Sequence, residues 1–479
     1  MKRALILAAF ACAAAPALAR PRADQPVDTA PAPIPSAWPK GEAYVLPGDA
    51  ALPTYSHAQV LADPRLTRLI TLALANNQDL AAALANIEAA RNQITIQRAA
   101  LFPEIDANGG FTHAEGTGTR VSGATTKGDA ASLTGAMASY ELDLFGRLRG
   151  LTAAAKASYL ASEAGSRATR LTLIANVANG WLTYAADRSL LQLAQDTATS
   201  ARQSVALTRR RVEGGIGLLA DQRKAELTLQ TAQADIAAQT NAVAQDLNAL
   251  RLLVGADIPA DALPANITDA SAHLAPVAPG LDSAILLRRP DVAQAEFTLR
   301  AAFANVDAAR AAMYPKITLT SVAGVATTAL GSLLTPSSFA WGLSSAANWP
   351  IFKGGAVKGA YKVSQAQRDA ALATYRKTLQ SAFADVANVL SWRGTIEAQT
   401  AATQAARDAA ADNYRLTNRR YEGGIGTWLD ALTAQQSLYA SEKTLVATKL
   451  ARASNLVGLY RALGGDNAAI APQSKAKVG

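Results

Sequence analysis

The sequence has almost no cysteine or histidine. Cys12 is the only cysteine, so the chain can form neither an internal disulfide nor a thiolate metal site. His57, His113 and His273 are scattered along the chain, with no second ligand at helical spacing, and we expect them at surface or loop positions. No metal site and no cofactor is therefore predicted.

Aromatic and charged side chains are also scarce. Only 6% of the 479 residues are aromatic and 17% are charged, whereas alanine is abundant throughout. Helices of this composition pack closely side by side but build few thick cores, which argues against several globular domains. The formal charge of +9 is spread out with no long basic run, so no nucleic-acid partner is predicted.

Motifs of enzymes are missing as well. No glycine-rich loop follows a strand and opens a helix, which leaves phosphate binding unsupported; residues 423–426 follow a helix instead. Glu141 and Asp143 lie two apart on one predicted strand face, as an acid/base pair could, but we interpret them as a solvated or lumen-facing strand end. We predict no catalytic residue and no enzyme activity.

Residues 1–19 have the pattern of a secretory signal peptide, with two basic residues, an apolar run and a small-residue site at Ala17-Leu18-Ala19. We predict cleavage after Ala19 and export across an inner membrane. A lipid anchor on Cys12 is the alternative, although the residues before it suit a lipidation site poorly. Residues 20–57 are rich in proline and alanine, and we expect an extended segment without its own core.

Two glycine-rich stretches organise the rest of the chain. Residues 211–217 (Arg-Val-Glu-Gly-Gly-Ile-Gly) recur 209 positions later as residues 420–426 (Arg-Tyr-Glu-Gly-Gly-Ile-Gly). Glycine adopts the positive φ values that a reversal between helices needs, so each copy predicts the tip of a helical hairpin. A single copy would favour an ordinary helix C-cap, but two copies with matching flanks indicate an internal duplication.

The spacing of apolar residues predicts a mainly α protein with a small β part, built from two structural repeats. The first repeat covers residues 58–255 and the second covers 281–464, with a crossover at 256–280 between them and a tail at 465–479. The elements predicted for the first repeat are a helix at 63–101, strands at 105–112 and 132–144, a long helix at 147–211, a tip at 214–217 and a return helix at 218–253. Those predicted for the second are a helix at 281–313, strands at 317–325 and 339–348, a long helix at 357–422, a tip at 423–426 and a return helix at 427–463.

Residues 317–352 contain no charged side chain, but their many glycine, serine and threonine residues argue against a transmembrane helix. Apolar residues alternate along two runs of about 10 residues, which is typical of a hairpin in a membrane β-barrel. Trp341, Trp349 and Phe352 are candidates for an aromatic girdle. Four strands cannot close a barrel and lipid tolerates no open edge, so oligomerisation is predicted. The core of a soluble sheet is the alternative.

Three stretches give the chain a resemblance to the TolC-like outer-membrane efflux channels, particularly the branch that serves resistance-nodulation-division pumps. They are residues 140–147 (Tyr-Glu-Leu-Asp-Leu-Phe-Gly-Arg), 287–292 (Leu-Arg-Arg-Pro-Asp-Val) and 420–424 with Leu429-Asp430. The resemblance covers residues 58–464. The chain departs from many close relatives in lacking a lipidated cysteine followed by Gly-Pro-Asp-Tyr, and in having Tyr140 where tryptophan is common.

The resemblance implies a homotrimer in which each protomer gives four strands to a shared outer-membrane β-barrel of twelve strands. It also implies that the long antiparallel helices form a periplasmic α-barrel. The implied function is the outer-membrane channel of a tripartite efflux system, a passive duct for drugs, toxic compounds or metals. Its partners would be outer-membrane lipid, a periplasmic adaptor and an inner-membrane pump of the resistance-nodulation-division type. The outer component of a type I protein-secretion system and a helical envelope scaffold without a pore are the alternatives.

The resemblance also places functional residues at the two tips. The glycines are expected to face the adaptor: Gly214, Gly215, Gly217, Gly423, Gly424 and Gly426. Residues around them are expected to constrict the tunnel or to tie neighbouring tips together: Leu429, Asp430, Thr433, Leu219, Asp221, Arg420 and Tyr421. The alternative is that Leu429 packs between helices and that Asp430 merely caps the start of a helix.

Overall fold

The computed structural model describes residue 39 and residues 57–114, 128–274, 283–327 and 335–465. The predicted signal peptide, most of the predicted extended segment at 20–57 and almost all of the tail lie outside these residues. Cys12 and residues 115–127 and 328–334 lie outside them as well. The signal peptide and the lipid anchor therefore stay predictions.

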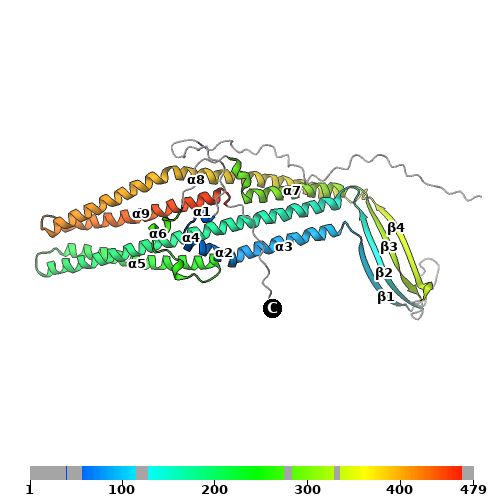
Figure 1. Cartoon of the computed structure of the whole chain (residues 1–479), viewed down its shortest axis with the longest axis horizontal. Coiled ribbons are helices and arrows are strands. Elements are labelled where there is room, and N and C mark those ends of the chain that lie inside the picture. Colours follow the sequence, from blue (N-terminus) through cyan, green and yellow to red (C-terminus); the bar gives the residue numbers. More distant parts are fainter. Residues whose placement is uncertain (1–38, 40–56, 115–127, 275–282, 328–334, 466–479) are drawn as a thin grey trace, which may run out of the picture. The chain divides into compact units, whose positions relative to one another are not determined.

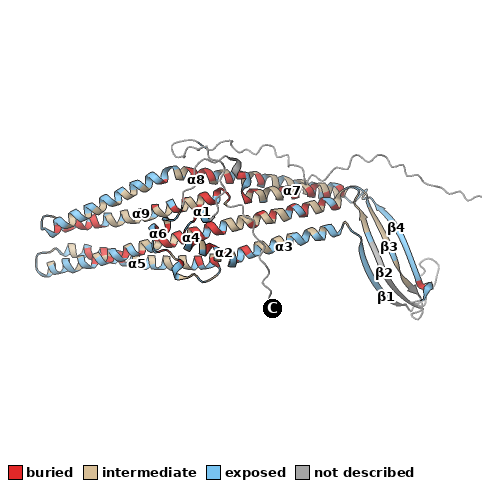
Figure 2. Ribbon diagram, in the orientation of Figure 1, coloured by how far each residue is buried: buried red, intermediate tan, exposed pale blue. Residues whose placement is uncertain are grey.

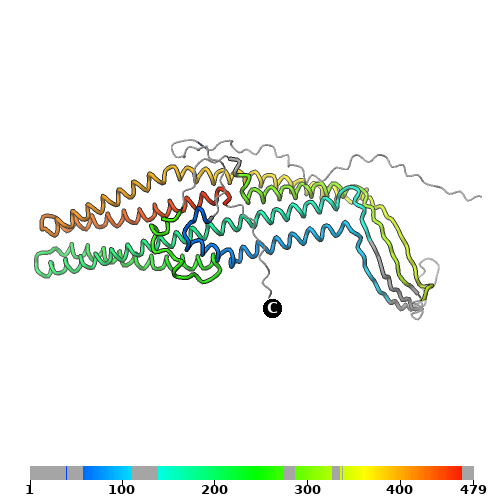
Figure 3. Tube along the Cα trace, in the orientation of Figure 1, coloured from blue at the N-terminus to red at the C-terminus, as the bar shows by residue number. Residues whose placement is uncertain are grey.

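The two halves of the chain repeat one order of elements: a helix, a β-hairpin, a very long helix and a return helix (Figures 1 and 3). The two very long helices have 67 residues each, and the return helices have 36 and 35. The first half contains α1 (His57–Val60), α2 (Pro64–Asn76), α3 (Gln78–Ala99), β1 (Glu104–Ala114), β2 (Gly128–Leu142), α4 (Arg147–Glu213) and α5 (Leu219–Val254). The second contains η3 (Ser283–Arg288), α7 (Pro290–Ala311), β3 (Lys316–Thr327), η5 (Pro336–Ser338), β4 (Phe339–Asn348), α8 (Ala356–Glu422) and α9 (Trp428–Ala462). The fold is thus mainly α with a small β part and an internal repeat.

The chain divides into two compact units. Within the described residues, unit 1 takes Ile87–Ser162 and Ala295–Tyr375, which include the whole sheet. Unit 2 takes the described parts of Pro31–Asn86, Glu163–Gln294 and Arg376–Gly479, which include both return helices. None of the described helices has a stretch long and apolar enough to cross a membrane.

The sheet in unit 1 has the order β1-β2-β3-β4, with every neighbouring pair antiparallel. Residues directly opposite one another in such pairs share a face. One face is apolar and includes the pairs Tyr140–Leu319, Leu142–Ile317, Ser321–Leu343 and Ala323–Trp341. The other is polar and includes the pairs Glu104–Ser139, Glu141–Thr318, Lys316–Asn348 and Thr320–Ser344. All of β4 is exposed in the single chain (Figure 2), and Trp341 is 75% exposed.

Strand β2 ends at Leu142, two residues earlier than predicted. Asp143 is not solvated, because its carboxylate accepts hydrogen bonds from the backbone N–H groups of Leu148 and Arg149 at 3.2 and 2.9 Å. A carboxylate satisfies these otherwise unpaired N–H groups in the first turn of a helix and complements its positive end. Residue 143 therefore belongs to the start of α4 rather than to the strand.

The predicted helix at 63–101 is wrong in its continuity, because Asn77 separates α2 from α3. Its backbone is extended (φ −65°, ψ 128°), and its side-chain oxygen accepts a hydrogen bond from Leu80 N at 3.0 Å. Its side-chain nitrogen donates to Leu253 O at 2.9 Å, which ties the break to α5. Asn77 thus ends one helix and caps the next, as asparagine commonly does.

The predicted helix at 281–313 is also wrong at its start. A 3₁₀ helix, η3, precedes α7, and α7 begins at Pro290 because proline fits a first helical position and restricts the residue before it. That residue, Arg289, is buried and donates to Ala462 O at 3.0 Å, Asp291 at 2.7 Å and Asp385 at 3.2 Å. Burial opposes ionisation of Asp291, but the hydrogen bonds from Arg289 lower its pKa below the ordinary value. Arg289 and Asp291 are structural.

The predicted crossover is not wholly irregular, because it contains η2 (Ala260–Ala262) and α6 (Ile267–Ser271). Both pack against α4 of unit 2. The indole N–H of Trp181, which is fully buried, donates to Ala262 O at 3.0 Å, and the backbone N–H of Ile267 donates to Ser189 Oγ at 2.9 Å. These two hydrogen bonds hold the crossover against α4 within unit 2, which also contains the helical hairpins α4–α5 and α8–α9.

Candidate functional site: the two hairpin tips

Each hairpin of unit 2 reverses at its glycine-rich stretch through the same hydrogen-bonded turn (Figure 3). At the first tip, Ile216 N donates to Arg211 O and Gly215 N donates to Val212 O, at 2.9 and 3.0 Å. At the second tip, Ile425 N donates to Arg420 O and Gly424 N donates to Tyr421 O, at the same two distances. This pair of bonds defines a Schellman motif, which uses the last carbonyls of a helix. The duplicated sequence therefore folds into duplicated geometry.

Only one glycine in each turn needs a positive φ. Gly215 has φ +73° and Gly424 has φ +76°, and a Cβ at either would point into open space. Gly217 is required for a different reason, since a Cβ there would lie 2.8 Å from Arg211 Cβ and from Val212 N. A Cβ at Gly426 would lie 3.1 Å from Arg420 Cβ, a milder crowding of the same kind. The positive φ expected of a reversal is therefore taken by one glycine in each turn.

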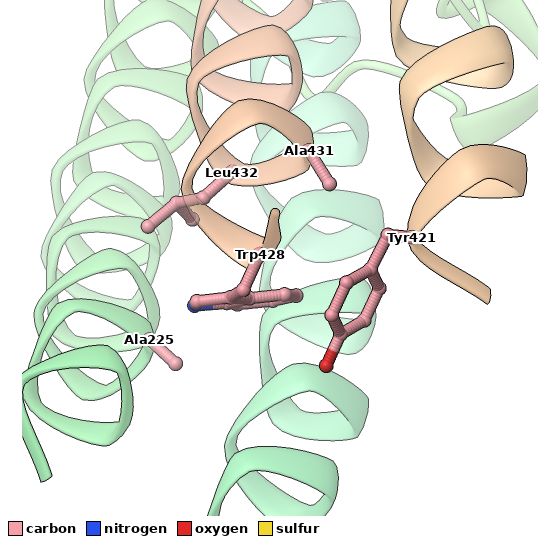
Figure 4. Packing of buried hydrophobic residues seen from close by; sticks show 5 residues of the cluster. All are labelled: Ala225, Tyr421, Trp428, Ala431 and Leu432. Atoms are coloured by element: carbon pink, nitrogen blue, oxygen red, sulfur yellow. The ribbon is translucent and has the colours of Figure 1, made fainter. Parts of the chain in front are cut away.

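A small apolar cluster joins helices α5, α8 and α9 just behind the tips (Figure 4). It consists of Ala225, Tyr421, Trp428, Ala431 and Leu432, with Val205 of α4 packed against it. The rings of Tyr421 and Trp428 lie 5.4 Å apart with their planes inclined at 56°. All four helices of the two hairpins thus meet in one cluster.

Tyr421 also connects the two tips by a polar contact. Arg211, near the end of α4, donates from Nη1 to Tyr421 Oη at 2.8 Å, and its guanidinium carbon lies 5.4 Å from the centre of the same ring. Tyr421 is only 8% exposed. The expectation that Tyr421 ties tips together therefore has a direct counterpart within one chain, whereas ties between chains stay a prediction.

A second link between the hairpins lies further from the tips. Tyr439 of α9 donates to Asp235 of α5 at 2.6 Å, and Lys443 of α9 reaches the same oxygen at 3.4 Å. Burial and the hydrogen bond to the Asp235 carboxylate raise the pKa of Tyr439 above the ordinary tyrosine value. The phenol therefore stays protonated and keeps donating at physiological pH.

A groove of about 390 Å³ lies between α8 and α9 beside the second tip. Five of the predicted tip residues line it: Arg420, Gly426, Leu429, Asp430 and Thr433. Thr433 donates to the backbone oxygen of Leu429 at 2.8 Å. The side chains of Arg420 and Asp430 are exposed, and within the described part of the chain neither makes a hydrogen bond or an ion pair. One free cation and one free carboxylate therefore border this groove.

In the single chain, Leu429 does not pack between helices and Asp430 does not cap the start of α9, as the alternative interpretation would require. Leu429 is 47% exposed rather than packed between helices. The start of α9 is capped by Thr427, whose Oγ1 accepts from Asp430 N at 3.1 Å. Leu219 and Asp221, which the sequence suggested at the first tip, do not line this groove, and Leu219 is 56% exposed.

Trp428 was missed by the sequence analysis. The 209-residue offset aligns it with Leu219, and aligns Tyr421 with Val212. The differences between the two tips thus include two aromatic residues, and the structure packs these two rings against each other. Comparing the repeats residue by residue would have revealed this signal.

The candidate girdle residues all lie in unit 1 and are exposed in the single chain. Trp341 is near the start of β4, whereas Trp349 follows its end and Phe352 comes three residues later. Trp349 and Phe352 are 60% and 87% exposed, and Trp349 Nε1 donates to Met313 O at 3.2 Å. Trp341 and Trp349 are separated by eight residues, or about 26 Å along an extended strand. Strands of outer-membrane barrels tilt by about 35–45°, so this length would span about 19–22 Å of membrane, somewhat less than the height of about 25 Å expected for the apolar band.

Comparisons with known proteins place the chain among exporters. A family model described as outer membrane efflux protein matches residues 69–256 and 281–465. Two relatives from Pseudomonas putida are each 40% identical over 440 residues, covering 91% of this chain and 90% of the relative: the antibiotic efflux pump outer membrane protein ArpC and the toluene efflux pump outer membrane protein TtgC. A solved structure of the open state of the Neisseria gonorrhoeae MtrE outer membrane channel is 32% identical, with a TM-score of 0.76, covering 90% of this chain and 98% of that one.

Proposed function

The chain belongs to the outer membrane efflux protein family, and from that premise we propose that it is the outer-membrane channel of a tripartite efflux system. The names of its relatives, which refer to antibiotic and toluene efflux pumps, support small toxic molecules as the cargo. The family match over both repeats is the observation that carries this proposal. It also favours small-molecule efflux over protein secretion and over a scaffold without a pore.

We propose that three copies assemble around one axis. The four-stranded sheet has two unpaired edges, β1 and β4, which a single chain leaves open. Three sheets joined edge to edge would close a barrel of twelve strands and leave no open edge in lipid. The apolar sheet face would then contact lipid, and the polar face would line a water-filled interior.

The channel itself would be passive. Its site has a groove and free charged groups but no arrangement of acid, base and nucleophile, and within the described residues no group of three or more His, Cys, Asp and Glu side chains is placed to hold a metal. We propose that an inner-membrane pump, of the resistance-nodulation-division type, supplies the energy and that the protein catalyses no reaction. A periplasmic adaptor would join the pump to the tips.

The tips would have two tasks. The open turns at Gly215 and Gly424 would dock the adaptor, because they present backbone without side-chain cover. The groove beside the second tip would form the constriction, with Leu429 as its apolar part and Asp430 as its charged part. Three copies would bring three such grooves together around the axis.

A deletion strain that expresses the chain from a plasmid tests the function. With the pump and adaptor present, we expect the chain to lower dye and drug accumulation, and to be recovered from outer membranes as a trimer. A strain that lacks only the pump is the control and should show no effect of the chain. Recovery of a monomer from the periplasm, with accumulation unchanged, would contradict the proposal.

A further inference from the structure

Unit 1 has a pocket at the end of the sheet nearest to α4. Some of the cationic groups of this pocket form no ion pair with the carboxylates that line it. The pocket has a volume of about 210 Å³ and lies where β2 and β4 end and β3 and α4 begin. Arg147, Lys316 and Lys353 supply its cations, and Glu141 and Asp143 supply its carboxylates.

Both carboxylates are already satisfied within the chain. Glu141 accepts two hydrogen bonds from Arg147, at 2.9 and 2.6 Å, and pairs with Lys316 at 2.8 Å. Asp143 caps the start of α4, as described above. The side chain of Lys353 is exposed and makes no hydrogen bond or ion pair within the described residues. The pocket therefore has an unused ammonium group and the unused hydrogens of Lys316.

The opposite edge of the same sheet has the complementary charge. Glu104 and Asp106 open β1, and both side chains are exposed and unpaired among the described residues. They share the polar sheet face with Glu141 and Lys316. Because β1 begins at Glu104 and β4 ends at Asn348, the acidic edge and the lysine pocket are at the same end of the antiparallel sheet.

We propose that Glu104 and Asp106 of one copy complete the pocket of the next copy by pairing with Lys353 and Lys316. This inference rests on the proposed trimer, in which β1 of one chain would pair with β4 of its neighbour. Lys353 cannot reach these carboxylates within one chain, because it follows β4, and β1 and β4 are separated by three strand spacings, or about 14 Å. A second copy is the occupant whose charges and position both match, since it presents carboxylates on the same face and at the same end.

The pairing would fix the order of sheet edges around the proposed trimer, so that β1 of each copy meets β4 of the next. When the charged ends of two copies lie on the same side of the membrane, like edges would bring carboxylates against carboxylates or lysines against lysines, and like charges at close range repel. Head-to-tail contact alone pairs opposite charges at this end of each of the three seams. The same residues therefore stabilise contact between β1 of one copy and β4 of the next, and disfavour contact between two β1 edges or two β4 edges.

Charge reversal tests the pairing by the temperature at which trimers dissociate in detergent. We expect Lys353→Glu to lower this temperature, Glu104→Lys with Asp106→Lys to lower it as well, and the three changes together to restore much of the loss. Lys362→Glu is the matched control, since Lys362 is an exposed lysine, unpaired among the described residues, nine positions further along in α8, and it should have little effect. Loss in Lys353→Glu without restoration in the combined variant would overturn the pairing and point to another anion, such as a lipid phosphate.

Crosslinking between two differently tagged copies gives an independent readout. One copy carries Glu104→Cys, the other carries Lys353→Cys, and both carry Cys12→Ser. A short thiol-reactive crosslinker should join the two tags into one band, whereas two copies that both carry Lys353→Cys should not be joined. Trimers of the unmodified chain without any mixed crosslink would overturn the pairing alone, whereas absence of trimers from the outer membrane would overturn the proposed function too.

Discussion

Arg211 and Tyr421 are 210 positions apart in the sequence, yet the guanidinium of one donates a hydrogen bond to the phenol of the other at 2.8 Å. The contact joins the last turn of α4 to the last turn of α8, immediately before the two glycine turns. Because Tyr421 also packs on Trp428, this one side chain links Arg211 at the first tip to the apolar cluster in which all four helices meet.

Tyr421→Phe should loosen the tips without unpacking them. The variant keeps the ring against Trp428 but loses the hydrogen bond from Arg211, which is worth about 1.5–3 kcal/mol when one partner is charged. We expect a larger single-channel conductance and unchanged trimer yield. Tyr439→Phe, which removes the link to Asp235 further from the tips, is the comparison and should change conductance less. Equal conductance of Tyr421→Phe and the unmodified channel would count against the link.

Gly424→Trp should abolish efflux while trimers still form. The φ of +76° makes any side chain at this position costly by about 1 kcal/mol, but a Cβ meets no atom within 4 Å, so the bulk points outward toward the proposed adaptor. Gly424→Ala has the same backbone strain without the bulk and should keep most efflux. Dye accumulation in cells measures both variants, and normal efflux with tryptophan would remove this tip from the adaptor interface.

Asp430→Ala should alter leak or conductance more than it alters assembly. Its carboxylate is exposed in the groove and has no partner within the described part of the chain, so its removal breaks no contact in the single protomer. Asp221→Ala at the first tip is the matched change outside that groove. Single-channel recordings in potassium chloride decide the matter, and an unaltered Asp430→Ala channel would exclude Asp430 from the constriction.

Arginine on the apolar sheet face should impair assembly. Leu319→Arg and Leu343→Arg would put a charge into lipid, at about 2–4 kcal/mol near the bilayer midplane. Thr320→Arg and Ser344→Arg are controls one residue away, on the polar face, and should be tolerated. Trimer yield in outer membranes is the readout, and equal yields from both faces would contradict the proposed orientation of the sheet.

The hairpin of α4 and α5 should be less stable at higher pH. Burial, the charge of Asp187 and a hydrogen bond with it raise the pKa of Asp246 to about 7, and one carboxylate oxygen of Asp246 is buried without a partner. Since the folded chain binds this proton more tightly than the unfolded chain, stability falls as pH rises from about 4 to 7 and then levels off. Asp246→Asn should flatten this dependence in thermal unfolding scans and raise stability at pH 8. A pH dependence identical to that of the unmodified chain would contradict this origin.

Much of the fold could be predicted because the pattern is long and occurs twice. The sequence predicted helices at 147–211 and 357–422, and the structure has them at Arg147–Glu213 and Ala356–Glu422. A helical periodicity sustained over so many residues excludes a strand or a loop, and each glycine-rich stretch marks the C-terminal end of one long helix.

The features that could not be predicted depend on contacts between distant residues. Asn77 breaks a helical pattern because its side chain binds Leu253, which lies 176 positions away. The alternation of the sequence assigned Asp143 to a strand. The structure shows that its carboxylate instead accepts a hydrogen bond from the backbone N–H of Arg149 at the start of α4. At the tips, the sequence indicated the glycines and Tyr421, but burial of Trp428 results from the meeting of all four helices.

The equal lengths of α4 and α8 limit how the gene can change. Each residue in a helix adds about 1.5 Å to its length and rotates the next residue by about 100° around its axis. A single deletion in α4 would therefore draw Arg211 back along the hairpin and rotate it away from Tyr421, although no contact residue had been altered. Only paired insertions or deletions, of the same length in both long helices, keep the two glycine turns at the same distance along the hairpins. Selection should therefore remove mutations that change the length of one long helix alone, whereas length changes between the strands of a β-hairpin or in the crossover should be tolerated.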